Sequence, residues 1–168
     1  QAPAKTTIPA GKDFWVDLVL YNDELAPIDS IGAAIQFDPK ALQVIDEDQG
    51  NPITRGVNIW DGGFRVDYPF DVFRANQADN RTGIILYSMG RYQSSHPFPT
   101  GIFARIHFRA IMPADITAIR LIRSEKPGLP LTFIRTYGVD RLALPEPSQP
   151  LHSIRLRIMA QLEQPGRQ

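Results

Sequence analysis

Cysteine is absent from the 168 residues, and so are long apolar runs and an excess of charge of either sign. Without cysteine, the chain forms neither a disulfide nor a thiolate metal site. No apolar run approaches the roughly 20 residues of a membrane span, and the chain does not begin with a charged-then-apolar signal sequence. Eighteen basic residues balance 18 acidic ones, so no global field favours nucleic acid or an anionic membrane. We therefore expect no membrane span and no nucleic acid partner.

Long stretches without proline or glycine are also missing, because 15 prolines and 12 glycines are spread along the chain. They leave little room for a long amphipathic helix. Short β-branched and aromatic runs lie between them and predict about nine strands. These runs are residues 14–21, 31–37, 41–45, 64–73, 83–90, 101–111, 116–124, 131–138 and 152–159. Strands at this spacing predict an all-β fold, an antiparallel β-sandwich.

The composition, 43% hydrophobic and 21% charged, is typical of one soluble globular domain. The chain contains no internal repeat. We predict a single domain over residues 6–160, with linker-like ends at residues 1–5 and 161–168.

The segment IQFDPKALQVID (35–46) predicts a strand, a sharp stop and a second strand. Asp38 can cap a turn with its side chain, and Pro39 has no amide proton with which to continue the strand. Leu42 can then return to the core. We interpret this segment as a corner where the chain crosses from one sheet to the other.

The segment FARIHFRA (103–110) alternates apolar and basic side chains. Because side chains alternate across a strand, Arg105, His107 and Arg109 share one face. A solvated outer surface and a partner-binding face both fit this pattern.

Catalytic and metal-binding motifs are missing. The three histidines, His96, His107 and His152, lie in different segments without metal-ligand spacing, and the chain has neither a nucleophile elbow nor a phosphate loop. The acidic run 46–48 lacks the full calcium-loop pattern of an EF-hand, and a solvated loop is the favoured interpretation. We expect a noncatalytic domain with no metal and no cofactor.

Four segments resemble, in order and rough spacing, those that mark cohesin modules and the related cellulose-binding modules. They are TTIPAGKDFWVDLVLYN, IQFDPKALQVID, TGIILYSMG and TGIFARIHFRAI. The resemblance runs from about residue 6 to residue 159 and implies a jelly-roll sandwich. The arginine- and proline-rich stretch over residues 120–159 departs from it, which indicates a distant member whose partner need not be a dockerin.

Cohesins bind dockerins, which are small calcium-loaded modules of other secreted proteins. The resemblance therefore implies a protein-binding module, located outside the cell or at the cell surface, with any calcium carried by the partner. A signal sequence would then lie outside this chain.

The resemblance also implies a binding face, made by the strands over 31–37, 64–73, 83–88 and 103–109. With Ala33, Ile35, Ile85 and Tyr87 pointing inward, the outward residues are Ala34, Gln36, Ile84, Leu86, Ser88, Arg105 and His107. An apolar centre with a polar rim is typical of a protein interface. The alternative is that the loop from Tyr92 to Thr100 covers Ile84 or Leu86.

Carbohydrate binding is the competing hypothesis, because the same superfamily includes modules that bind polysaccharide through a row of exposed aromatics. Candidates are Trp60, Tyr68, Phe70 and Tyr92, although Trp60 is interpreted more simply as packed over a sheet edge. A third hypothesis is a structural spacer of a surface protein, without a ligand.

Overall fold

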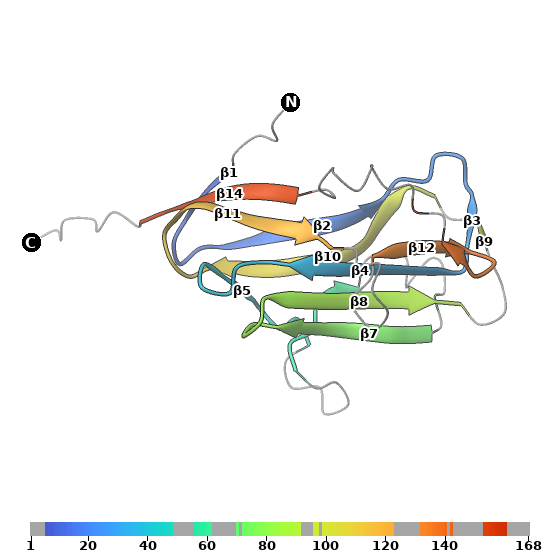
Figure 1. Ribbon diagram of the computed structural model, residues 1–168, viewed down its shortest axis with the longest axis horizontal. Coiled ribbons are helices and arrows are strands. Elements are labelled where there is room, and N and C mark those ends of the chain that lie inside the picture. Colours follow the sequence, from blue (N-terminus) through green and yellow to red (C-terminus); the bar gives the residue numbers. More distant parts are fainter. Residues whose placement is uncertain are drawn as a thin grey trace, which may run out of the picture.

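Two packed sheets make up the domain (Figure 1). A computed structural model of the chain describes residues 6–48, 56–61, 70, 72–91, 96–97, 99–122, 132–140, 142 and 153–160. Among these residues no helix is present, and so none could span a membrane. The ends predicted as linkers, 1–5 and 161–168, lie outside the described residues.

The larger sheet contains eight strands, and we call it the large sheet. Its main path is β1 (Thr6–Pro9), β14 (Ser153–Met159), β11 (Ala114–Leu121), β4 (Ser30–Gln36), β12 (Phe133–Thr136) and β13 (Val139–Asp140). On its other edge, β4 pairs with β8 (Ile84–Gly90), and β8 pairs with β7 (Val72–Asp79). Figure 1 shows β4, β8 and β7 side by side.

The smaller sheet, called the small sheet, is built around β10. Its strands are β2 (Asp13–Leu20), β10 (Gly101–Ala110), β5 (Leu42–Val44) and β6 (Trp60–Asp61). A separate two-stranded ribbon joins β3 (Pro27–Ile28) to β9 (His96–Pro97).

The hydrophobic core lies between the two sheets and follows the strand alternation. On β8, Ile85 and Met89 are fully buried and point inward, and on β10 the inward residues Ile106 and Phe108 are fully buried as well. The predicted all-β sandwich is confirmed. The antiparallel prediction fails at one pairing, because β1 and β14 run parallel.

The predicted strand at 64–73 falls largely on residues that the structure does not describe. Residues 62–69 and 71 lie outside the described residues, and the strand that pairs with β8 is β7, over Val72–Asp79. Half of the residues in its sequence, VFRANQAD, are polar. β7 pairs with no strand other than β8 among the described elements, and a strand of this kind needs few apolar residues to be stable.

The predicted corner at 35–46 is confirmed. The backbone N–H of Lys40 donates to the Asp38 carboxylate at 2.9 Å, and that of Leu42 donates to the Asp38 carbonyl at 2.9 Å. The chain thereby leaves β4 in the large sheet and enters β5 in the small sheet. Leu42 is fully buried.

Two asparagine side chains join the sheets beside this corner. Asn80 follows β7, and its amide accepts from Val44 N at 2.7 Å and donates to Val44 O at 2.9 Å. Asn76 makes the same pair of bonds to the backbone of Ile59, at 2.8 and 2.9 Å. Each amide replaces a strand partner that the backbone would otherwise need.

Thr132 fills the point where β4 changes partner from β11 to β12. Its buried hydroxyl accepts from Ala34 N at 3.1 Å and donates to Ile122 O at 2.7 Å. Thr117, on β11, is equally buried, but its hydroxyl has no hydrogen-bond partner. The threonine hydroxyl is therefore stabilising at position 132, where it is hydrogen-bonded, and destabilising at position 117, where it is buried without a partner.

We predict that changing threonine to valine affects the free energy of unfolding differently at these two positions. Thr132→Val should lower the free energy of unfolding by about 1–3 kcal/mol, because Ala34 N loses its acceptor in a buried site. Thr117→Val should leave the free energy of unfolding unchanged or raise it by up to about 1 kcal/mol, because it removes an unsatisfied hydroxyl at constant shape. Denaturant unfolding of both variants measures this, and equal losses would contradict it.

Candidate functional site

The outer face of the large sheet carries most of the predicted binding residues. Residues that are opposite one another in register point to the same side. Gln36 on β4 is opposite Arg120 on β11 and Ile84 on β8, and Ile84 is opposite Asp79 on β7. These four side chains form one row across four strands. We call the outward residues of β7, β8, β4, β11 and β12 the large-sheet face.

The centre of this face is apolar and partly exposed. Ile84, Leu86 and Ser88 point outward and are half-buried, as the alternation on β8 predicted. Leu86 lies opposite Gln77, an exposed polar residue on β7. The loop named above as an alternative cover for them includes 92–95 and 98, which lie outside the described residues.

Ala34 is a correction within this face. It lies opposite Leu86 on the outer side of β4, yet it has no exposed surface. It lies beside the partner change of β4, where its backbone bonds to Thr132 and to Ile122. A single methyl group there does not rise above its neighbours, so Ala34 offers a partner no contact area. Gln36, one position further along the face, is exposed.

Phe133 closes one end of the face. It is opposite Gly32 on β4, and a Cβ on Gly32 would come within 2.8 Å of Phe133 Cζ. The glycine therefore allows the ring to lie on the strand. Arg135 packs over the ring, with its Cζ 4.5 Å from the ring centroid, which is cation–π geometry.

Arg105 and His107 do not belong to the large-sheet face, so the prediction of one shared face is wrong. Their strand, β10, pairs with β2, β5 and β6 in the small sheet and not with β4 or β8. Alternation correctly placed both residues on an outer surface. The pattern contains no information on which of the two sheets a strand joins, and here that sheet is the opposite one.

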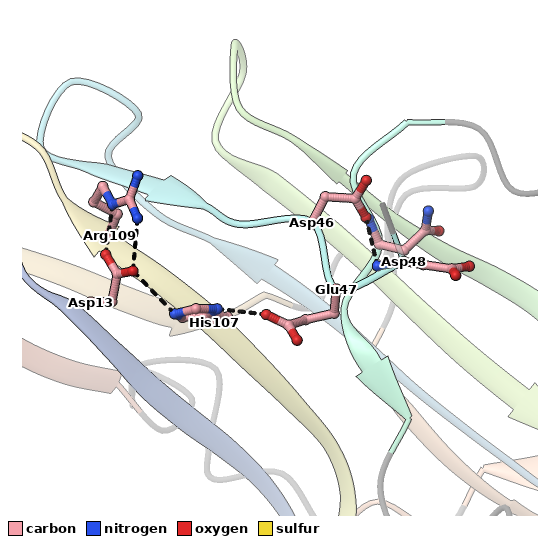
Figure 2. Close-up of polar contacts among 7 residues, drawn as sticks. Asp13, Asp46, Glu47, Asp48, His107 and Arg109 are labelled. Carbon is pink, nitrogen blue, oxygen red and sulfur yellow. Dashed lines mark hydrogen bonds and ion pairs between the residues drawn. The ribbon is translucent and has the colours of Figure 1, made fainter. Parts of the chain in front are cut away.

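The charges on the small-sheet surface are neutralised within the sheet. Arg105 forms a bidentate pair with Asp17 at 2.5 and 3.0 Å, and Arg109 forms one with Asp13 at 2.6 and 2.8 Å. Figure 2 shows His107 between two carboxylates. Its Nδ1 is 2.5 Å from Glu47, and its Nε2 is 3.5 Å from Asp13.

The acidic run at 46–48 is also engaged internally. Asp46 accepts a backbone N–H bond from Asp48 at 3.1 Å (Figure 2) and another from Asn58 at 3.0 Å. Glu47 contacts His107. No group of side chains suited to hold a metal ion occurs within the part of the chain that the structure describes.

Two exposed tryptophans flank Arg105 on the small sheet. Trp15 is 47% exposed and stacks on His107 with ring centroids 4.2 Å apart, and Trp60 is 45% exposed. The Arg105 guanidinium carbon lies 5.9 Å from the Trp15 ring and 5.7 Å from the Trp60 ring. Trp15 is a surface residue that is absent from the predicted set, although its alternation with the buried Val16 was the available signal.

Within the described residues, the aromatics predicted for carbohydrate binding do not form an exposed row. Phe70 is 3% exposed and belongs to the core. Tyr68 and Tyr92 lie outside the described residues. Trp60 is therefore the one described candidate of that set with exposed surface.

This architecture matches that of solved cohesin structures. The third cohesin ScaC of Acetivibrio cellulolyticus, solved with the ScaB dockerin, matches with TM-score 0.64 at 14% identity, over 93% of this chain and 95% of that chain. The chain has the cohesin fold.

Two further cohesins match nearly as broadly. A type II cohesin domain from the cellulosome of Acetivibrio cellulolyticus gives TM-score 0.64 at 17% identity, over 90% of both chains. A type I cohesin–dockerin complex, Coh-OlpA-Doc918 from Clostridium thermocellum, gives 0.61 at 17% identity, over 92% of this chain and 94% of that chain. No family model and no curated protein matches the sequence. The likeness is therefore one of fold at low sequence identity.

We predict a measurable consequence of the Asp13–Arg109 pair. The hydrogen bond from the Arg109 side chain holds the pKa of Asp13 below its ordinary value, with partial burial opposing. The stabilisation from this pair is then present above the unfolded-state pKa of Asp13 and is lost as pH falls through the lower folded-state pKa. Arg109→Gln should raise the Asp13 pKa, followed by NMR of the carboxyl carbon. Arg105→Gln is the control and should leave that pKa unchanged.

Proposed function

We propose that this domain is a noncatalytic protein-binding module that engages a partner protein through the large-sheet face. The observation that carries the proposal is the half-buried apolar pair Ile84 and Leu86 at the centre of that face, with exposed Gln36 and Gln77 beside it. Apolar side chains surrounded by polar ones are typical of protein interfaces. The cohesin fold supports the proposal, because related structures were solved as complexes with dockerins.

A dockerin-type module is the first partner class to test, in an extracellular or cell-surface assembly like the cellulosome of the matched cohesins. Calcium in such a complex would belong to the dockerin. Identity to the matched cohesins is 14–17%, so a partner of another type is an outcome of the test. A spacer role predicts that no partner binds.

The large-sheet face is favoured over the small-sheet surface for a physical reason. Arg105 and Arg109 already have carboxylate partners, so a charged partner would have to break existing ion pairs to reach them. Ile84 and Leu86 are apolar, so a partner would break no ion pair to reach them. Covering them with a partner removes apolar area from water at roughly 25 cal/mol per Å².

We predict that Leu86→Asp and Ile84→Asp each weaken partner binding by about 30-fold or more, because a central interface residue is worth about 2 kcal/mol. Both side chains point outward, so circular dichroism and thermal unfolding should show an intact fold. Calorimetric titration with a panel of calcium-loaded dockerins measures the affinity. Val19→Asp is the matched control, since Val19 is an exposed residue of the small sheet.

Four outcomes would contradict the proposal. Retained affinity in both face variants would show that the large-sheet face is not the interface. A loss of affinity confined to Val19→Asp would assign the interface to the small sheet. Unfolding of either face variant would assign the residue to the core. Binding of the wild-type domain to insoluble cellulose or chitin, with no dockerin bound, would favour the carbohydrate hypothesis.

A further inference from the structure

Three exposed arginines border the large-sheet face on β11 and β14. On β14, Leu156 and Ile158 are buried in the core, so Arg155 and Arg157 point outward. On β11, Ile119 is buried, so Arg120 points outward on the same side. We call Arg120, Arg155 and Arg157 the arginine border.

The members of the border are neighbours on the sheet. Arg120 is opposite Ser153, and Arg155 is opposite Ala118, so the two arginines are diagonal neighbours across β11 and β14. Such positions lie about 7–8 Å apart between Cα atoms. Arg155 and Arg157 are two residues apart on one strand, roughly 6–7 Å along it. Like charges at this spacing repel one another.

The repulsion is hardly compensated within the described residues. Arg157 Nη2 lies 3.7 Å from Asp115, whose side chain is 96% exposed, and a pair of this kind contributes little. Arg120 and Arg155 have no carboxylate partner in the part of the chain that the structure describes. By contrast, Arg105 and Arg109 on the small sheet each form a bidentate pair.

The border is continuous with the apolar centre of the face. Arg120 is in the same cross-strand row as Gln36 and Ile84, so it lies two strands away from Ile84, about 10 Å. At the far end of this row, Asp79 is held by its own turn, with its carboxylate accepting from Arg81 N at 2.8 Å and from the Thr82 hydroxyl at 2.8 Å. This row is therefore basic at its β11 end and acidic at its β7 end.

We propose that the partner of the large-sheet face is an acidic protein surface, with carboxylates that pair with Arg120 and Arg155. This inference rests on the proposed function, which names the face, and adds the charge of the partner. Arginine suits the role, because its planar guanidinium binds a carboxylate through two parallel hydrogen bonds. Charge complementarity of this kind raises the association rate and orients the partner.

The test uses a defined acidic probe, so it does not depend on finding the natural partner. Hexaglutamate is titrated into the isotope-labelled domain at low salt, and backbone and arginine side-chain NMR signals are followed. Hexaglutamine is the neutral probe. We expect shifts at the arginine border with hexaglutamate, none with hexaglutamine, and loss of the shifts at high salt.

Two double variants separate a local site from net charge. Arg120→Gln with Arg155→Gln should weaken hexaglutamate binding about five- to tenfold, the effect of two exposed ion pairs. Lys40→Gln with Arg81→Gln removes the same net charge from two exposed positions elsewhere and should leave the affinity within about twofold. Thermal unfolding verifies that both variants are folded.

Equal weakening by both double variants would overturn the proposal, and so would shifts centred outside the border. Hexaglutamate bound at the border, with no effect of Leu86→Asp on dockerin binding, would refute the proposed function alone. Dockerin binding that needs Leu86 but is unchanged by the border variant would refute this inference alone.

Discussion

The bonding of β4 along both of its edges is the constraint on which the rest of the large sheet depends. One edge pairs with β8 along its whole length, whereas the other is shared between β11 and β12. The Thr132 hydroxyl bonds at the gap between these two partners, so that Ala34 N is satisfied where neither strand reaches it. Without that bond, a buried amide would be left without an acceptor at the centre of the sheet. The position of Ile84 and Leu86 relative to Arg120 follows from this arrangement.

The two outer surfaces of the sandwich are organised differently. On the small sheet, Arg105 and Arg109 on β10 each pair with an aspartate on β2, His107 contacts Glu47 in the loop after β5, and Arg105 lies between two indole rings. The arginines of that surface are therefore paired within the domain, while Trp15 and Trp60 are exposed on it. On the large sheet, apolar side chains remain half-exposed and Arg120 and Arg155 have no described carboxylate partner. The protein has no net charge, so the two surfaces differ in how the charged residues are distributed over them.

Local pattern was enough to predict part of this structure. Alternation on β8 identified Ile84, Leu86 and Ser88 as outward, and Asp38 with Pro39 identified the corner between the sheets. Sheet membership could not be predicted in this way, because an alternating strand such as β10 has the same pattern in either sheet. The strand β7 lies mostly outside the predicted range 64–73; half of its residues are polar, and one of them, Asn76, bonds to the backbone of Ile59 in the neighbouring segment 56–61. The backbone of Ala34 bonds to Thr132, which is 98 residues away in the sequence, and local pattern carries no information over that separation.

Amide hydrogen exchange of the domain, with and without a bound dockerin-type partner, tests the central claim most directly. The account predicts that added protection is confined to β4, β7 and β8, with β11 next, and that β2 and β10 exchange as in the free domain. Amides that are hydrogen-bonded within strands exchange slowly even in the free domain. The exchange rates of the free and bound domain are therefore compared over long times, at amides on the outer edge of each strand and next to loops. Protection centred on β2 and β10 would contradict the account and assign binding to the small sheet.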